Sequence, residues 1–359
     1  MPNDPRVTFD ELSAFIRTVL EAAGLPPSDA ATVARLMAEA DLQGSDGHGV
    51  IRLPMYVKRI LAGGMNVRPD IRVVSERAAT ALVDGDNGMG HLVMSFAAEV
   101  AIAKARTAGV AWVGARASNH AGPASLYARM ALPHDMIGLY FAVGNANHLP
   151  PWGGLQMLLS TNPIAAAIPT ASEPPIVLDM ATTVTAYGKV KAKAARGEAM
   201  PEGWMMDRAG RPLLDPKRAA EGVLLPIGGH KGYGLALVFG ILAGTLNGAA
   251  MGKDVIDFNA DHVTPTNTGQ AIVAIDPAAF GDPAEFKAAA DALVRDLRSS
   301  ERLPGVERIW LPGEQSHLRR ARYAQEGIPV VPSVLADLDA LADRLGTPRL
   351  PAVARRVAA

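Results

Sequence analysis

A histidine and an arginine lie four residues apart in a glycine-rich stretch, Gly44 to Arg52, that follows a predicted helix. If the chain after His48 is helical, His48, Arg52 and Tyr56 share one face and could hold one small anion. An arginine fork suits a carboxylate, and a histidine near a helix N-terminus stays neutral and can exchange a proton near neutral pH. Pro54 either kinks this helix or marks its first turn, which would leave His48 and Arg52 in the preceding loop. The alternative is a turn with a satisfied histidine and a surface arginine.

Two further polar groups lie at predicted strand ends, where α/β proteins usually hold ligands. The first is Ser118-Asn-His120-Ala-Gly122, in which His120 could be an acid, a base or a hydrogen-bond partner of a cofactor. Helix capping by Ser118 is the alternative. The second is Asp179-Met180-Ala181-Thr182-Thr183, whose free N–H groups and threonine hydroxyls could receive ribose or phosphate oxygens, or whose aspartate could simply cap a helix.

Two lysines have both a binding and a structural interpretation. Lys189 could bind a carboxylate or polarise a carbonyl in a closed site, although a lysine on a helix is most often solvated. Lys231 lies in Gly228-Gly-His230-Lys-Gly232-Tyr-Gly234, whose small residues could let backbone N–H groups cradle a phosphate. A flexible turn before a buried helix is the alternative. The spacing matches neither G-x-G-x-x-G nor a P-loop, so a standard Rossmann site is not expected.

Composition excludes several classes of function. The chain has 359 residues, of which 49% are hydrophobic and 20% charged, and a net charge of −1 with scattered basic residues, so no nucleic-acid partner is expected. It has no cysteine, and its histidines lack metal-ligand spacing, so we expect neither disulfides, thiolate chemistry nor a metal. The polar N-terminus indicates a cytoplasmic protein. The uncharged stretch Tyr233–Met251 is better explained as a buried helix than as a membrane span.

Periodicity predicts an α/β protein with helices at both ends of the chain. Thr8 with Glu11 forms a possible capping box, and Ser28 precedes a second helix. Alternating strands and helices then favour a partly parallel sheet, with Asp84–Gly90 as a turn. Strands are expected at 80–84, 110–115, 136–143, 164–169, 175–179 and 271–276, and helices at 92–107, from about 123, at 283–299 and at 334–345. The segment 196–214 reads as a surface excursion that could be a lid.

Eight segments, taken together and in order, resemble the malate/L-lactate dehydrogenase-like family, which includes ureidoglycolate and sulfolactate enzymes and some cyclic-imine reductases. The segments are Asp41–Arg59, Asp84–Gly88, Ser118–His120, Pro151–Gly154, Thr161–Pro163, Asp179–Thr183, His230–Gly234 and Leu311–Glu314. The resemblance extends from about Thr8 to Pro329. It implies a non-Rossmann mixed-sheet lobe that binds NAD or NADP, a helical lobe built from both chain ends, and a homodimer. We expect residues 1–115 with 276–359 to form the substrate and dimerisation lobe, and 116–275 the NAD(P)-binding lobe.

The resemblance also implies roles for individual residues. His48 matches the family's proton donor and Arg52 its substrate-carboxylate contact, while His120 is the rival acid/base. Asn145 would lie near the nicotinamide or substrate, with Tyr56 as a further substrate contact and Lys189 as a catalytic candidate. The cofactor-binding candidates are Asp179, Met180, Ala181, Thr182, Thr183, His230, Lys231, Gly232, Gly313 and Glu314.

Two positions bear on the substrate. The family often has serine before the first histidine, where this chain has Gly47, and its imine-reducing members carry an acidic residue where this chain has Lys189. Lysine favours interconversion of a small 2-hydroxy acid and its 2-oxo acid. The alternatives are a reductase of a cyclic imine carboxylate, such as pyrroline- or piperideine-2-carboxylate, and a catalytically silent nucleotide binder, which Gly47 could indicate.

Overall fold

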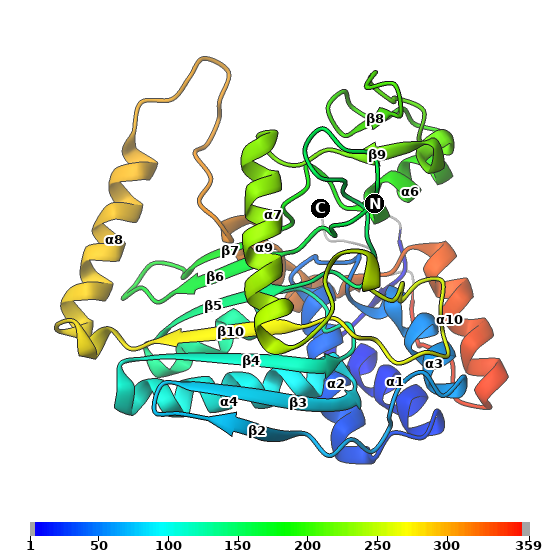
Figure 1. The fold of residues 1–359 in the computed structure, drawn as a ribbon, viewed down its shortest axis with the longest axis horizontal. Coiled ribbons are helices and arrows are strands. Elements are labelled where there is room, and N and C mark those ends of the chain that lie inside the picture. Colours follow the sequence, from blue (N-terminus) through cyan, green and yellow to red (C-terminus); the bar gives the residue numbers. More distant parts are fainter. Residues whose placement is uncertain (1–3, 354–359) are drawn as a thin grey trace.

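A seven-stranded mixed sheet forms the centre of the molecule in the computed structural model, which describes residues 4–353 apart from the side chains of residues 192, 195 and 196 (Figure 1). The strand order is β2-β3-β4-β10-β5-β6-β7. The pair β3 and β4 is parallel and every other neighbouring pair is antiparallel. The strands are β2 (Arg72–Glu76), β3 (Thr80–Gly88), β4 (Val110–Ser118), β5 (Ile137–Ala142), β6 (Ile164–Ile168), β7 (Ile176–Met180) and β10 (Gln270–Ile275).

Helices cover both faces of this sheet. Helix α4 (Gly90–Ala108) joins the parallel strands and packs on β3, β4 and β10, with α5 (Ser125–Ala128) further along the same face. The alanines of α4 are buried against the sheet and allow a close approach. Helix α7 (His230–Ala243) crosses the opposite face (Figure 1).

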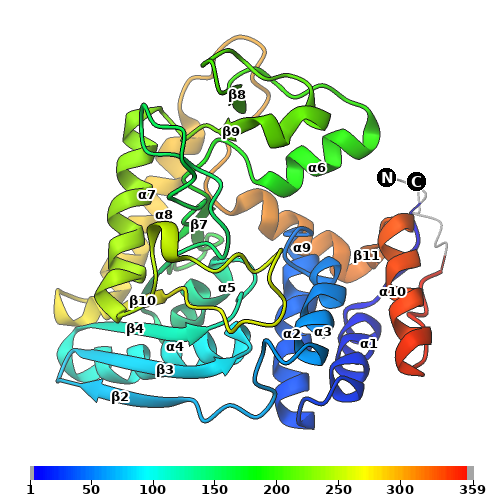
Figure 2. The same ribbon diagram turned by 45° about the vertical axis from the view of Figure 1, so that its right-hand side comes forward.

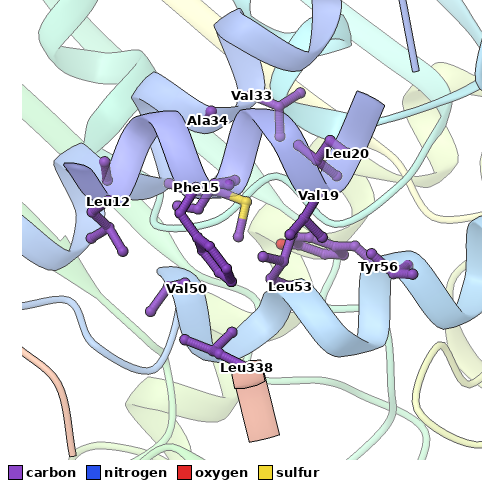
Figure 3. Close-up of a cluster of buried hydrophobic side chains, with 14 of the residues drawn as sticks. Leu12, Phe15, Val19, Leu20, Val33, Ala34, Val50, Leu53, Tyr56 and Leu338 are labelled. Carbon is purple, nitrogen blue, oxygen red and sulfur yellow. The ribbon is translucent and has the colours of Figure 1, made fainter. Parts of the chain in front are cut away.

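A helical lobe built from both chain ends lies beside the sheet (Figure 2). It contains α1 (Phe9–Ala22), α2 (Pro27–Leu42), α3 (Leu53–Leu61), α9 (Glu314–Glu326), α10 (Pro332–Leu345) and the short pair β1 (Arg6–Val7) and β11 (Ile328–Pro329). Apolar side chains from α1, α2, α3 and α10 interlock in its core, and the ring of Tyr56 closes one side of this core (Figure 3). The capping box of Thr8 and Glu11 is confirmed at the start of α1.

A smaller lobe with its own apolar core carries α6 (Tyr187–Arg196), β8 (Met205–Asp207) and β9 (Gly222–Leu224). Helix α8 (Pro283–Ser299) lies at the outer edge of the molecule and continues into a long loop (Figure 1). The short 3₁₀ helices are η1 (Val50–Arg52), η2 (Arg129–His134), η3 (Pro216–Glu221), η4 (Thr245–Asn247), η5 (Gly252–Asp254) and η6 (Pro277–Ala279).

The mixed α/β fold and the helical lobe from both ends are confirmed, while several local predictions were wrong. The segment expected to be a turn at Asp84–Gly90 continues as strand β3 to Gly88. The sheet is partly parallel as predicted, through β3 and β4 alone. Ser28 lies inside the first turn of α2, because that helix begins at Pro27. The uncharged helix ends at Ala243 and is partly exposed, although no helix among residues 4–353 combines the length and apolarity that a membrane span needs. The boundary near residue 115 stays a prediction, and the sheet itself continues across it.

The loop that carries His48 is tied to α2 by a buried carboxylate. Asp41 is 7% exposed, and its Oδ2 accepts a 2.7 Å hydrogen bond from the backbone N–H of Val50. Burial raises the pKa of Asp41 well above its usual range, although the bond from Val50 opposes this. A Cβ at Gly49 would lie 2.1 to 2.3 Å from the atoms of that carboxylate. Only glycine at position 49 therefore lets the loop approach Asp41 this closely.

We expect Gly49→Ala to lower the free energy of unfolding by about 1–3 kcal/mol, because the added methyl group forces Asp41 and the loop apart. Gly47→Ala is the matched control, since a Cβ at Gly47 has no atom within 4 Å and its φ is not left-handed. Urea unfolding of both variants measures the difference. Equal stability of the two variants would contradict the close approach.

Candidate active site

Two histidines and a tyrosine that are far apart in the sequence meet where the helical lobe contacts the sheet. The rings of His48 and His120 are stacked, with centroids 5.4 Å apart and planes inclined by 10°. The hydroxyl of Tyr56 lies 2.6 Å from Nδ1 of His120. The backbone N–H of Gly122 donates to the same nitrogen at 3.3 Å. Because an N–H can only donate, Nδ1 of His120 is an acceptor and its neutral ring carries the proton on Nε2.

The chain reaches this arrangement through two local features. Pro54 lies in the first turn of α3, so His48 is in the preceding loop and Arg52 in η1, as one of the two alternatives from the sequence required. His120 follows the end of β4, and Gly90 lets the start of α4 pack against its backbone, because a Cβ there would lie 2.1 Å from the carbonyl oxygen of Asn119. The side chain of Asn119 then ties this turn to β3 through the carbonyls of Asn87 and Gly88.

A buried arginine fixes the aromatic wall of the site. The Arg59 side chain is completely buried and donates to the carbonyl oxygens of Gly64, Phe258, Asp261 and Thr264. Its guanidinium lies over the Phe258 ring, 4.6 Å from the ring centroid. That ring contacts His120, with a centroid separation of 5.9 Å, and Tyr56 at 6.2 Å. Arg59 therefore holds the loop that places Phe258 beside the histidines.

Arg52 and Asn145 lie on the borders of the histidine group. Nε of Arg52 donates to the carbonyl of Gly47 at 2.8 Å, which leaves the two Nη atoms without a partner among the described residues. Asn145 accepts a backbone hydrogen bond from Phe258 and donates to the hydroxyl of Thr268, both at 2.8 Å. Arg52 can therefore bind a carboxylate. Asn145 is connected to the site by its hydrogen bond with the backbone of Phe258.

The histidines are held in their neutral forms. Burial first, and then the charge of Arg52, lower the pKa of His48 to about 4. The pKa of His120 also lies well below its usual value, through burial first and then the charges of Arg52, His48 and His91. Burial raises the pKa of the Tyr56 hydroxyl, which therefore stays protonated. At neutral pH the site presents uncharged imidazoles beside one guanidinium.

The three predicted cofactor segments lie along β7, two at its end and one near its start. Ile227 donates to the carbonyl of Thr182 at 3.0 Å, which joins the segment Asp179–Thr183 to the start of α7. Gly313 packs on Val177, where a Cβ would lie 2.8 Å from the carbonyl oxygen, and the adjoining backbone bonds to β7. Asp179 is an exposed residue, but burial around its carboxyl group raises the pKa of that group, and its Oδ2 accepts the backbone N–H of Ser125 at 2.8 Å. The segment 118–125 thus connects the histidine group to the β7 end.

Some of these residues are accessible and others serve internal contacts. The hydroxyls of Thr182 and Thr183 are buried and donate to the carbonyls of Thr161 and Thr185, and no helix begins directly after Thr183. Gly232 packs against the backbone of Ile227. Glu314 is buried and bonds to Arg298, Arg308 and the backbone of Leu311. The more accessible candidates are Asp179, Met180, Ala181, His230, Lys231 and Gly313.

Lys189 is not among the residues that the fold gathers around His48. It lies on the exposed side of α6 in the small lobe, and no contact with the histidine group is present among the described residues. The stacked rings of His148 and Tyr187, 4.8 Å apart, join the start of this helix to the segment that follows β5.

Sequence reasoning missed His91, Phe258 and Arg59. His91 is fully buried in the first turn of α4 with its ring edge-on to Tyr56, and the centroids are 5.6 Å apart. A histidine at the start of an alanine-rich helix is a signal that could have been found, whereas nothing in the sequence around Phe258 indicates its role. No group of three metal-ligating side chains occurs in the described part of the chain.

We expect the folded protein to lose stability as the pH falls from about 6.5 toward 4. Burial lowers the pKa of His91 to about 3 and that of His48 to about 4, below the value of 6.5 in an unfolded chain. In this window the unfolded chain binds more protons, so its free energy falls relative to that of the folded state. Urea unfolding between pH 7.5 and 5 measures the slope. His91→Gln should reduce it by up to about 1.4 kcal/mol per pH unit, and an unchanged slope would show that His91 is not depressed.

Comparison with known proteins gives this geometry a context. The family model described as malate/L-lactate dehydrogenase matches residues 7–339. A malate dehydrogenase from Pyrococcus abyssi is 39% identical over 96% of this chain and 96% of its own. Ureidoglycolate dehydrogenase (NAD(+)) from Escherichia coli K12 is 32% identical, with 92% of this chain and 93% of that protein covered. A Δ1-pyrroline-2-carboxylate/Δ1-piperideine-2-carboxylate reductase from Pseudomonas putida is also 32% identical, with 94% and 96% covered.

The solved structures agree with these sequence relationships. The sulfolactate dehydrogenase structure from Methanocaldococcus jannaschii superposes with a TM-score of 0.89 at 35% identity and covers 95% of this chain and 98% of its own. Sequence and structure therefore agree over almost the whole chain, and the protein belongs to the malate/L-lactate dehydrogenase family.

Proposed function

We propose that this protein is a nicotinamide-dependent oxidoreductase that interconverts a small 2-hydroxy acid and its 2-oxo acid. The observation that carries the proposal is the stacked pair of His48 and His120 beside the unpartnered Nη atoms of Arg52. Neutral imidazoles can exchange a proton with an oxygen, and a guanidinium fork can hold a carboxylate. A 2-hydroxy acid carries both groups on adjacent carbons.

The residues around the end of β7 fit a dinucleotide. The carboxylate of Asp179, an exposed residue, can accept hydrogen bonds from ribose hydroxyls, with Met180 and Ala181 beside it. The start of α7 presents free N–H groups, together with His230 and Lys231, to a pyrophosphate. Thr182, Thr183, Gly232, Gly313 and Glu314 shape the site through the internal contacts described above. When bound, the nicotinamide accepts or supplies the hydride.

The two histidines have different proposed roles, one as a hydrogen-bond donor and one as the acid/base. Nδ1 of His120 accepts from Gly122 and Tyr56, so its Nε2–H is a fixed donor that can hold the substrate oxygen. Loss of that proton would leave an imidazolate, which makes His120 a poor acid. His48 has no partner on Nδ1, so this atom can carry the proton while Nε2 takes the hydroxyl proton during oxidation and returns it during reduction. His48 is therefore the proposed acid/base. Arg52 and Asn145 hold the substrate.

The relative that reduces cyclic imine carboxylates makes imine reduction a second candidate. Lys189, on the exposed side of α6, remains the residue from which we expect a preference for the oxo acid over the imine. A silent nucleotide binder is the third reading. Assays of one enzyme preparation determine which acid it uses and with which stereochemistry. They also determine the direction of the reaction and the choice between NAD and NADP.

The decisive assay follows NADH and NADPH oxidation with matched 2-oxo acids and cyclic imine carboxylates. We expect turnover of an oxo acid, and we expect His48→Ala to lower kcat by about 10²- to 10⁴-fold with cofactor affinity retained, because a positioned acid supplies that factor. Turnover of imines alone would overturn the proposed substrate class. Cofactor binding without any turnover would leave the silent binder. A loss of cofactor affinity in His48→Ala as large as the loss of kcat would contradict the assignment of His48 as the acid.

We also propose that the protein is a homodimer, with α7 in the interface. Leu235, Val238 and Ile241 recur every three residues on α7 and are 36%, 53% and 44% exposed, which forms an apolar stripe. A second copy would cover this stripe. Location in the cytoplasm and the division into two lobes remain predictions. An interface on α7 would put dimerisation on segment 116–275, not on the lobe of residues 1–115 with 276–359 that the sequence analysis assigned to it.

We expect Val238→Asp to convert the dimer into a monomer, because an unpaired carboxylate would be buried in the interface. Leu318→Asp is the control, since Leu318 is 43% exposed on α9, away from the stripe. Light scattering with size exclusion measures the mass of both variants. A wild-type monomer, or a Val238→Asp dimer as stable as the control, would contradict the proposal.

A further inference from the structure

His91 is a buried histidine whose ring nitrogens have no hydrogen bond among the described residues to offset their loss of hydration. Its side chain has no exposed surface, and neither Nδ1 nor Nε2 has a hydrogen-bond partner among the described residues. A buried unpaired donor or acceptor costs about 1–3 kcal/mol, and an apolar side chain of similar size would avoid this cost. Such local conflicts are typical of functional positions. The contacts of the His91 ring with its neighbours therefore indicate its role.

The ring of His91 touches both groups that hydrogen-bond to His120. It lies edge-on to the Tyr56 ring at 81°, and Tyr56 contacts Nδ1 of His120 through its hydroxyl. Nε2 of His91 faces Gly122, where a Cβ would lie 3.2 Å away, and the N–H of Gly122 donates to the same Nδ1. His91 thus lies behind both partners of one catalytic-site atom.

The backbone around His91 reinforces this placement. His91 is the second residue of α4, and Gly90 before it brings the helix start against the backbone of Asn119 and His120. The partial positive charge of a helix N-terminus favours a neutral imidazole. The titratable groups around His91 are His48, His120 and Tyr56, with the charge of Arg52 beyond them. A neutral ring at position 91 therefore supports the hydrogen bonds without adding charge to this group.

We propose that His91 is a positioning residue: its ring packs behind Tyr56 and Gly122 and so keeps Nδ1 of His120 an acceptor and the Nε2–H of His120 directed at the substrate oxygen. This inference rests on the proposed function of His120 as the fixed donor. Because the His91 ring lies against Tyr56 and beside Gly122, which both hydrogen-bond to Nδ1 of His120, we expect its effect on that atom to pass through these two residues.

The first test measures the tautomer of His120 and needs no substrate. Long-range ¹⁵N–¹H NMR of the full chain, with His120→Gln to assign the signals, should show the Nε2–H form in the wild type. His91→Leu should give a mixture of tautomers, with a melting temperature that is unchanged or higher because the unpaired nitrogens are gone. His91→Gln, a polar replacement, should also give the mixture and serves as the second variant if His91→Leu lowers the melting temperature. Met94→Leu, a buried apolar exchange one turn along α4, should change nothing. An unchanged tautomer in both His91 variants would overturn the proposal.

The second test is a double-mutant cycle with Tyr56→Phe, which lacks the hydroxyl. We expect His91→Leu to lower kcat about tenfold with cofactor affinity retained, and to lower it less than twofold further in the Tyr56→Phe background. Losses that multiply in the double variant would exclude the route through Tyr56. With a changed His120 tautomer in His91→Leu they would assign the effect to Gly122, and with an unchanged tautomer they would refute the proposal. If the wild-type enzyme oxidises no hydroxy acid, the proposed function fails, while the tautomer measurement still decides the role of His91.

Discussion

The hydrogen bond between the Tyr56 hydroxyl and Nδ1 of His120 joins the two main lobes at the site, and the surrounding structure depends on it. Tyr56 belongs to the core of the helical lobe, whereas His120 directly follows a strand of the sheet. The bond therefore fixes the position of one lobe against the other at the imidazole whose Nε2–H is proposed to hold the substrate oxygen. Arg59 and Phe258 strengthen the same junction, because the arginine carries the loop whose aromatic ring covers both residues.

Burial at this junction explains the electrostatics of the site. Three imidazoles within reach of one another and of Arg52 cannot all be charged, and each charge lowers the pKa of the others. The positive charge therefore stays on the guanidinium, where it attracts a carboxylate, while the imidazoles remain available for proton exchange. A site with charged histidines would bind anions more strongly but would have no base for the oxidation of an alcohol.

The sequence was informative wherever a signal was local. The capping box at Thr8, the helix 283–299 and most strands were predicted closely, because caps and periodicity depend on neighbours in the chain. A partly parallel sheet was also predicted, but which strands pair in parallel depends on long-range contacts, and in the seven-stranded sheet only β3 and β4 do so. Residues 48, 52, 56 and 120 were chosen from composition and resemblance, but their convergence required the fold. Phe258 and Arg59 were missed because their roles come from a contact between these two residues, which lie 199 positions apart in the chain.

The proposed cofactor segments would form a dinucleotide site without a glycine-rich Rossmann turn. In a parallel sheet one strand-to-helix turn supplies the phosphate cradle, and glycines must lie within a few residues of one another. Here β7 is an antiparallel edge strand, and the segments along it come from three distant parts of the chain. Their glycines serve separate contacts: Gly232 packs on Ile227, and Gly313, at a φ of +84°, packs on Val177. The spacing along the sequence is then unconstrained, which is why no single motif identified the site and only the ordered set of segments did.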